Sequence, residues 1–177
     1  MVFRRRKDDE ERAGSDEAAV IENLDRVSAL YATGLMETGP RPDLDAVART
    51  AAERLGTPVG LMTLVDARRQ YFIGHYDSRE DTDAERETPL DVSYCKHVVA
   101  RDAPLEVRDA KTDPVVRNNP VSQDGSVRSY LGVPLRTAEG HTIGSFCVVD
   151  DVPREWTTAD RTQLEHLAES AMATALS

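Results

Sequence analysis

Cysteine is scarce in this sequence, and long apolar segments are absent. The two cysteines, Cys95 and Cys147, are too few and too far apart for a disulfide framework or a metal-binding knuckle. No apolar run approaches the roughly 20 residues that span a bilayer, and the N-terminus lacks the apolar core of a secretory signal. We therefore expect a cytoplasmic protein with no membrane partner.

Positive charge is also in short supply, and catalytic signatures are missing. The chain has 22 Lys and Arg against 32 Asp and Glu, a net charge of −10. An acidic surface repels phosphates, so no nucleic-acid partner is expected. The sequence contains no nucleophile elbow, no glycine-rich phosphate loop and no HExxH motif. These absences predict that the protein is not an enzyme.

The N-terminal region divides into a charged tail and an amphipathic helix. In residues 1–15 the basic run Arg4–Lys7 is followed at once by acidic residues, without apolar periodicity, which predicts a disordered tail. Apolar residues then recur every three or four positions, predicting a helix over residues 16–37. Its stripe from Val20 to Leu35 is similar to a short heptad seam. We expect this stripe, with a second from Leu164 to Ala175, to form a homodimer.

The remaining pattern predicts an α+β domain with a central antiparallel sheet. The clearest element is the hairpin Ser129–Asp150, whose arms are joined by a short turn at Gly140. Strands are expected at 58–66, 70–76 and 105–107, and helices at 43–55, 94–101 and 158–176. The terminal helices should cover one face of the sheet. The middle helix and the irregular segment 109–124 should cover the other, where a crevice is the default small-molecule site.

Four segments resemble the GAF domain, a PAS-related sensory module of bacterial signalling proteins. They are VGLMTLVD (59–66), SYCKHV (93–98), VRDAKTDPVVRNNP (107–120) and YLGVPLRTAEGHTIGSFCVVDDVPR (130–154). The resemblance covers residues 43–177, which implies one GAF domain over 16–177 with the helix 16–37 as an extension. It also implies a ligand pocket under the layer opposite the terminal helices. The resemblance does not imply one ligand.

Candidate ligand-binding residues follow from the expected pocket: Tyr94, Cys95, His97, Asp109, Asn118, Tyr130 and Ser145. Cys95 and His97 are the most suggestive pair, because a helix start and a nearby imidazole lower a thiol pKa. A buried Cys and a rim His are the alternative reading. A Cys95–Cys147 disulfide is geometrically possible, and two buried cysteines that never meet are the alternative. For Cys147 we favour a place in the core.

Cofactors are left unknown, with neither haem nor bilin expected. A haem would need an axial ligand, and His75, His97, His141 and His166 are the candidates, without a further haem signal. Bilin-binding members of the family carry their Cys after the Asp109 strand, whereas Cys95 lies upstream. The Asn-Lys-Phe-Asp-type motif of cyclic-nucleotide members is not found.

The resemblance implies a stand-alone sensory protein. It would bind an unidentified small molecule or report redox state, and signal through its terminal helices to a partner protein. Two alternatives stay open. One is a thiol enzyme of the free methionine sulfoxide reductase type, although the family's multiple-cysteine pattern is not matched. The other is a ligand-free docking or dimerisation scaffold with a filled pocket.

Overall fold

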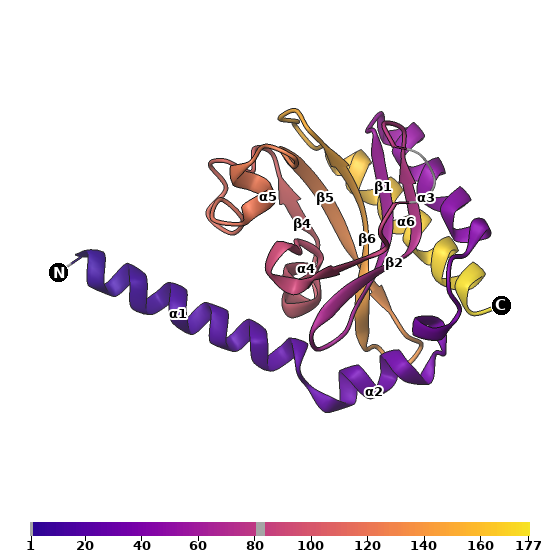
Figure 1. The fold of residues 1–177 in the computed structure, drawn as a ribbon, viewed down its shortest axis with the longest axis horizontal. Helices are drawn as coiled ribbons and strands as arrows, with labels where there is room; N and C mark the ends of the chain where they lie inside the picture. The colour runs from indigo at the N-terminus through magenta and orange to yellow at the C-terminus, as the bar shows by residue number, and fades with distance from the viewer. Residues whose placement is uncertain (1, 81–83) are drawn as a thin grey trace.

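A computed structural model describes residues 2–80 and 84–177 (Figure 1). The elements in chain order are α1 (Val2–Ile21), α2 (Leu24–Ala32), the 3-10 turn η1 (Leu35–Glu37), α3 (Pro42–Leu55), β1 (Val59–Val65), β2 (Arg69–Asp77), β3 (Glu87–Pro89), the 3-10 turn η2 (Leu90–Val92), α4 (Cys95–Arg101), β4 (Leu105–Val107), α5 (Pro120–Gln123), β5 (Ser129–Arg136), β6 (Thr142–Asp150) and α6 (Thr158–Ala175).

The strands form one antiparallel sheet in the order β3-β2-β1-β6-β5-β4. The predicted hairpin 129–150 is β5–β6, and its turn places Gly140 at φ 91°, a conformation that favours glycine. Strand β6 is buried along its whole length because it pairs on both sides and is covered on both faces. The α+β class with an antiparallel sheet is confirmed.

One face of the sheet is covered by α3 and α6, which pack against each other as well (Figure 1). Thr157 and Asp160 form a reciprocal capping box that starts α6. Just before it, the buried Trp156 donates from Nε1 to the Val107 carbonyl oxygen at 3.0 Å. The inner stripe of α6, from Leu164 to Ala175, is buried against the chain's own sheet. That stripe is therefore not free to pack against a second copy.

The opposite face carries α4, α5 and the segment between β4 and β5, as predicted. Alternation along β6 turns Phe146 and Val148 toward α3 and α6, and Cys147 and Val149 toward α4. Cys147 is thus fully buried on the face predicted to hold the pocket. The layer of α4 and α5 and the layer of α3 and α6 therefore lie on opposite sides of the sheet.

The N-terminal region differs from the prediction in two ways. Residues 2–15 were expected to be disordered, yet they belong to α1, whose positions 4–16 are exposed. The residues Arg4 to Lys7 stand four positions before Asp8 to Glu11, and opposite charges at that spacing stabilise a helix. The helix expected over 16–37 is also broken, because α1 ends at Ile21 and α2 starts at Leu24.

Two side chains explain this break. Asn23 caps α2 by accepting a hydrogen bond from the Arg26 amide at 3.1 Å. Arg26 is buried and donates to the carbonyl oxygens of Val65 at 2.7 Å and Ile21 at 2.6 Å. The bend lets α1 run along the face that carries α4 instead of joining α3 and α6 (Figure 1). It also leaves Val20 and Leu24 of the predicted stripe exposed.

No helix in the described part of the chain is long and apolar enough to cross a membrane.

Candidate functional site

A cavity of about 350 Å³ lies between the sheet and the layer formed by α4, α5 and the segment before β5. Its walls are mainly apolar, and its volume falls at the lower end of the range of small-molecule sites. The lining residues come from β1 (Val59, Leu61), β2 (Gln70, Phe72, Asp77), the following loop (Arg79, Glu80), β3 to α4 (Thr88, Val92, Tyr94, Cys95), α5 and its exit (Val121, Ser126, Val127), β5 (Tyr130) and β6 (Cys147, Val149).

The start of α4 is fixed by Ser93. Its buried hydroxyl donates to Gln70 Oε1 at 2.6 Å and accepts from the Lys96 amide at 3.1 Å. This brings the first turn of α4 down onto β2 and directs Tyr94 and Cys95 toward the cavity. The Tyr94 hydroxyl pairs with Ser122 of α5, which closes the helical layer over the cavity.

The two cysteines meet at the floor of the cavity. Their Sγ atoms are 3.9 Å apart, and both thiols are free. Cys95 Sγ also lies 3.2 Å from the Tyr130 hydroxyl oxygen, which in turn is 3.1 Å from Ser145 Oγ. A Cβ at position 132 would overlap the Tyr130 ring and hydroxyl, so Gly132 leaves the space that this side chain occupies. The sheet therefore positions this hydroxyl against the sulfur atoms.

The environment separates the pKa values of the two thiols. Burial raises the pKa of Cys95, but hydrogen bonds from Cys147 and Tyr130 outweigh it and lower the pKa to about 7. Burial and the neighbouring Cys95 raise the pKa of Cys147. Burial likewise raises the pKa of Tyr130, so its hydroxyl stays protonated and can donate. The arrangement gives one nucleophilic thiol next to one protonated thiol.

A further hydroxyl lies beside this pair. Thr63 of β1 is opposite Ser145 in the sheet register and is fully buried. Its Oγ1 has no hydrogen-bond partner within the described residues. Buried hydroxyl groups are rarely left unpaired, and this one acts on the two thiols, because it helps to lower the pKa of both Cys95 and Cys147.

The structure brings four of the seven predicted site residues together. The cavity is lined by Tyr94, Cys95 and Tyr130, and the Ser145 hydroxyl is hydrogen-bonded to that of Tyr130. Their binding of a ligand remains a prediction.

The other three predicted residues lie elsewhere. The imidazole of His97 faces away from the cavity, with Nδ1 2.8 Å from Glu17 Oε1 of α1. Asp109 pairs with Arg128 at 2.9 Å and accepts from the Lys111 amide, as in an Asx turn. Asn118 is exposed on the loop before α5.

Sequence reasoning missed the contribution of β2 and the loop after it. Phe72 lines the cavity from β2, and Arg79 lies at its rim. The Arg79 guanidinium pairs with Asp77 at 2.9 Å and with Asp151 at 3.1 Å. Alternation of side chains along β2 could have placed Phe72 on the cavity face. The position of Arg79 depends on the path of the loop after β2.

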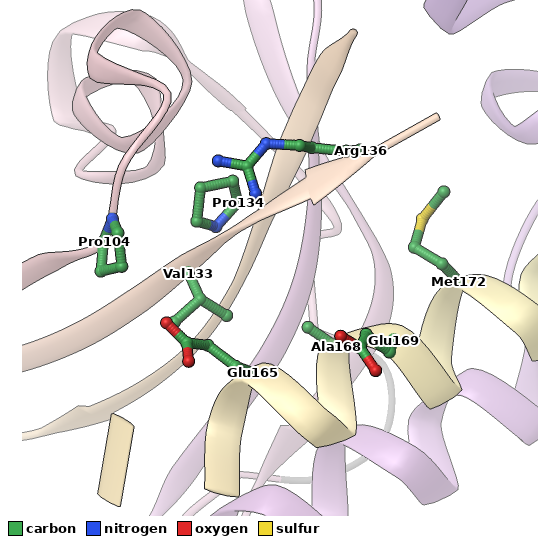
Figure 2. A pocket seen from close by; sticks show the side chains of 8 residues that line it. All are labelled: Pro104, Val133, Pro134, Arg136, Glu165, Ala168, Glu169 and Met172. Carbon is green, nitrogen blue, oxygen red and sulfur yellow. The ribbon is translucent and has the colours of Figure 1, made fainter. Parts of the chain in front are cut away.

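A second hollow of about 550 Å³ lies on the other side of the molecule, between β5 and α6 (Figure 2). Figure 2 shows Val133 of β5 directed toward Glu165 of α6, whereas the side chains of Pro134 and Arg136 lie on the other side of the β5 ribbon. The exposed charged side chains of Arg136 and Glu169 line it, and neither cysteine does. The cavity under α4 is the better candidate because buried polar groups converge there.

Solved structures of the same fold include a GAF domain and an enzyme. The GAF domain of an Acinetobacter phosphoenolpyruvate-protein phosphotransferase matches with a TM-score of 0.61 and 16% identity, covering 86% of this chain and 91% of that one. A type II free methionine-R-sulfoxide reductase from Thermoplasma acidophilum matches with a TM-score of 0.60 and 19% identity, covering 76% and 91%. At these identities the likeness shows the fold.

One curated relative is a cyclic di-GMP phosphodiesterase of Pseudomonas aeruginosa, 36% identical over 143 residues. The match covers 79% of this chain but only 23% of the phosphodiesterase. Our expectation that the protein is not an enzyme is contradicted by these comparisons, because relatives named for catalysis share its sequence or fold. The absence of these motifs excluded only a few classes of active site. An active site built on a pair of thiols needs none of those motifs.

The family assignment rests on a match that spans most of the chain. A family model described as a GAF domain matches residues 43–175, from the start of α3 to the end of α6. This range includes the whole sheet, the cavity and both cysteines. The chain belongs to the GAF domain family.

Proposed function

We propose that this protein is a sensory GAF module that binds a compact small molecule in the cavity under α4 and signals through its N-terminal helices to a partner protein. The observation that carries the proposal is the apolar cavity of about 350 Å³, with polar side chains converging on its floor and rim. In this proposal residues 16–177 act as one unit, in which 43–177 form the sensing core.

The lining constrains the ligand. Leu61, Phe72 and Val149 offer an apolar surface, and the Tyr94 and Tyr130 rings, 5.4 Å apart and edge-on, offer aromatic contacts. Arg79 at the rim carries a guanidinium that two carboxylates already neutralise in part. A compact apolar or aromatic molecule with one anionic or hydrogen-bonding group fits this distribution. The open cavity also favours ligand binding over a scaffold with a filled pocket.

The test is a binding screen with a cavity-filling control. Small aromatic carboxylates and their amides would be screened by ligand-observed NMR against the wild type, Val149→Trp and Val152→Trp. Val149 lines the cavity, whereas Val152 is 52% exposed and outside the lining. We expect hits that lose binding in Val149→Trp and keep it in Val152→Trp. Hits that survive Val149→Trp would place binding elsewhere.

The thiol pair favours a second function, the reduction of a sulfoxide. A Cys95 thiolate 3.9 Å from a protonated Cys147 can attack the sulfur of a bound sulfoxide. Overall, two thiols and one sulfoxide give one disulfide, one thioether and one water, which takes up the sulfoxide oxygen and the two thiol protons. Turnover of free methionine sulfoxide with dithiothreitol as reductant tests this. Turnover that persists in Cys95→Ser, or none in the wild type, would exclude it.

A further inference from the structure

Helix α4 lies between the cavity and α1. Cys95 and His97 are two residues apart, and at about 100° per residue their side chains leave the helix on opposite sides. Cys95 lines the cavity, whereas His97 Nδ1 lies 2.8 and 2.9 Å from the two carboxylate oxygens of Glu17 in α1. One short helix thus contacts the cavity on one side and the N-terminal helix on the other (Figure 1).

The contact surface of α1 is small. Between positions 4 and 21 the helix is exposed except at Glu17, which is half-buried, and at Ile21, which is buried in the cluster around the cavity. An exposed pair, Glu10 with Arg117 at 3.6 Å, adds little. The docking of α1 therefore depends on Glu17, Ile21 and the cap that Arg26 provides at the Ile21 carbonyl.

The Glu17 carboxylate is held in its charged form. Burial raises its pKa, but the hydrogen bond and charge of His97, with further cations at Arg101 and Lys96, outweigh that effect and lower the pKa. All three of these positive or protonatable groups belong to α4. A displacement of α4 would therefore weaken the attraction that holds α1 in place.

We propose that α4 couples the cavity to α1, so that occupation or modification of the cavity at Cys95 shifts the docking of α1 through the His97–Glu17 contact. The proposal rests on the cavity being the sensing site. By linkage the effect is reciprocal. If modification of Cys95 weakens the docking of α1, then weaker docking of α1 must favour modification of Cys95. The expected size is that of ordinary coupling, roughly 5-fold or more.

The first experiment measures Cys95 from the α1 side. Glu17→Ala removes the contact, Glu17→Gln keeps a hydrogen-bond acceptor without the charge, and Asp16→Asn removes a charge from the exposed neighbouring position. The rate at which N-ethylmaleimide modifies Cys95 would be followed by peptide mass spectrometry. With dilute reagent, opening of the cavity is fast relative to modification, so the rate follows the equilibrium population of the open form. We expect Glu17→Ala to raise that population, and with it the rate, roughly 5-fold or more, Glu17→Gln less, and Asp16→Asn not at all. Equal rates in folded Glu17→Ala and wild type would overturn the proposal.

The second experiment measures α1 from the cavity side. Hydrogen exchange of residues 16–21 would be compared before and after N-ethylmaleimide blocks Cys95, with Cys95→Ser as the control that cannot be labelled there. We expect faster exchange in α1 only when Cys95 is blocked. Unchanged exchange in the labelled wild type would also overturn the coupling. Neither experiment uses the natural ligand. If both experiments show the coupling but the binding screen fails, only the proposed function is refuted.

Discussion

The Tyr130 hydroxyl is the group whose removal tests the chemistry of the thiol pair most sharply. It lies 3.2 Å from Cys95 Sγ, and Tyr130 is only 2% exposed. A hydrogen bond to a charged group contributes about 1.5–3 kcal/mol. Because one pKa unit corresponds to about 1.4 kcal/mol, Tyr130→Phe should raise the Cys95 pKa by about one to two units.

This shift has a measurable consequence at neutral pH. Hydrogen bonds to its sulfur lower the pKa of Cys95 toward neutral pH. A rise in this pKa removes thiolate, about tenfold per unit once the pKa lies above the pH. Thiolate absorbance near 240 nm, followed from pH 5 to 10, should show the lower of the two thiol titrations moving upward. The two thiols interact, so the values belong to the pair.

Tyr94→Phe is the matched control. Tyr94 also lines the cavity and is 5% exposed, but its hydroxyl pairs with Ser122 instead of a sulfur. We expect this variant to leave the thiol titration within about 0.3 units of the wild type, since it removes no hydrogen bond to sulfur. An unchanged titration in Tyr130→Phe, or equal shifts in both variants, would refute the assigned hydrogen bond.

Three further predictions concern stability and assembly. Arg26→Met should lower the free energy of unfolding by about 2–3 kcal/mol in urea, because it leaves the buried Val65 and Ile21 carbonyls without their donor; a loss below about 0.5 kcal/mol would contradict this role. Burial raises the Asp66 pKa, but the Arg68 and Arg69 amides and the Tyr31 hydroxyl outweigh it and lower the pKa. Its stabilisation should thus be complete above about pH 4 and be lost as pH falls further, a loss that Asp66→Ala should reduce in urea titrations. Leu24, 79% exposed on α2, should support a homodimer in sedimentation, and Leu24→Glu should give monomers; wild-type monomers would exclude it.

The sheet and the face of the cavity could be predicted because they depend on local pattern. Apolar residues fill both arms around Gly140 and specify the β5–β6 hairpin, and Thr157 with Asp160 caps the start of α6. Ser93 before an apolar turn placed Cys95 at the start of α4. These signals lie within a few residues of the elements that they determine.

The contacts that give the site its chemistry could not be predicted in the same way. Cys95 and Cys147 meet because α4 covers β6, and sequence left open whether they approach each other. The partner of His97 is Glu17, 80 residues away on a helix that was expected to join the opposite layer. That expectation failed because Arg26 bends the chain between α1 and α2. An arginine in a helical pattern is expected to be exposed, whereas Arg26 is buried.

The most direct test of the account is native mass spectrometry of freshly purified wild-type protein beside Val149→Trp. We predict that the wild type carries a small molecule that is released on denaturation. Val149→Trp, whose added ring fills the cavity, should show only the mass of the polypeptide. An identical bound mass in both proteins, or a bare polypeptide in both after incubation with the hits from the binding screen, would contradict the claim that this cavity is the sensing site.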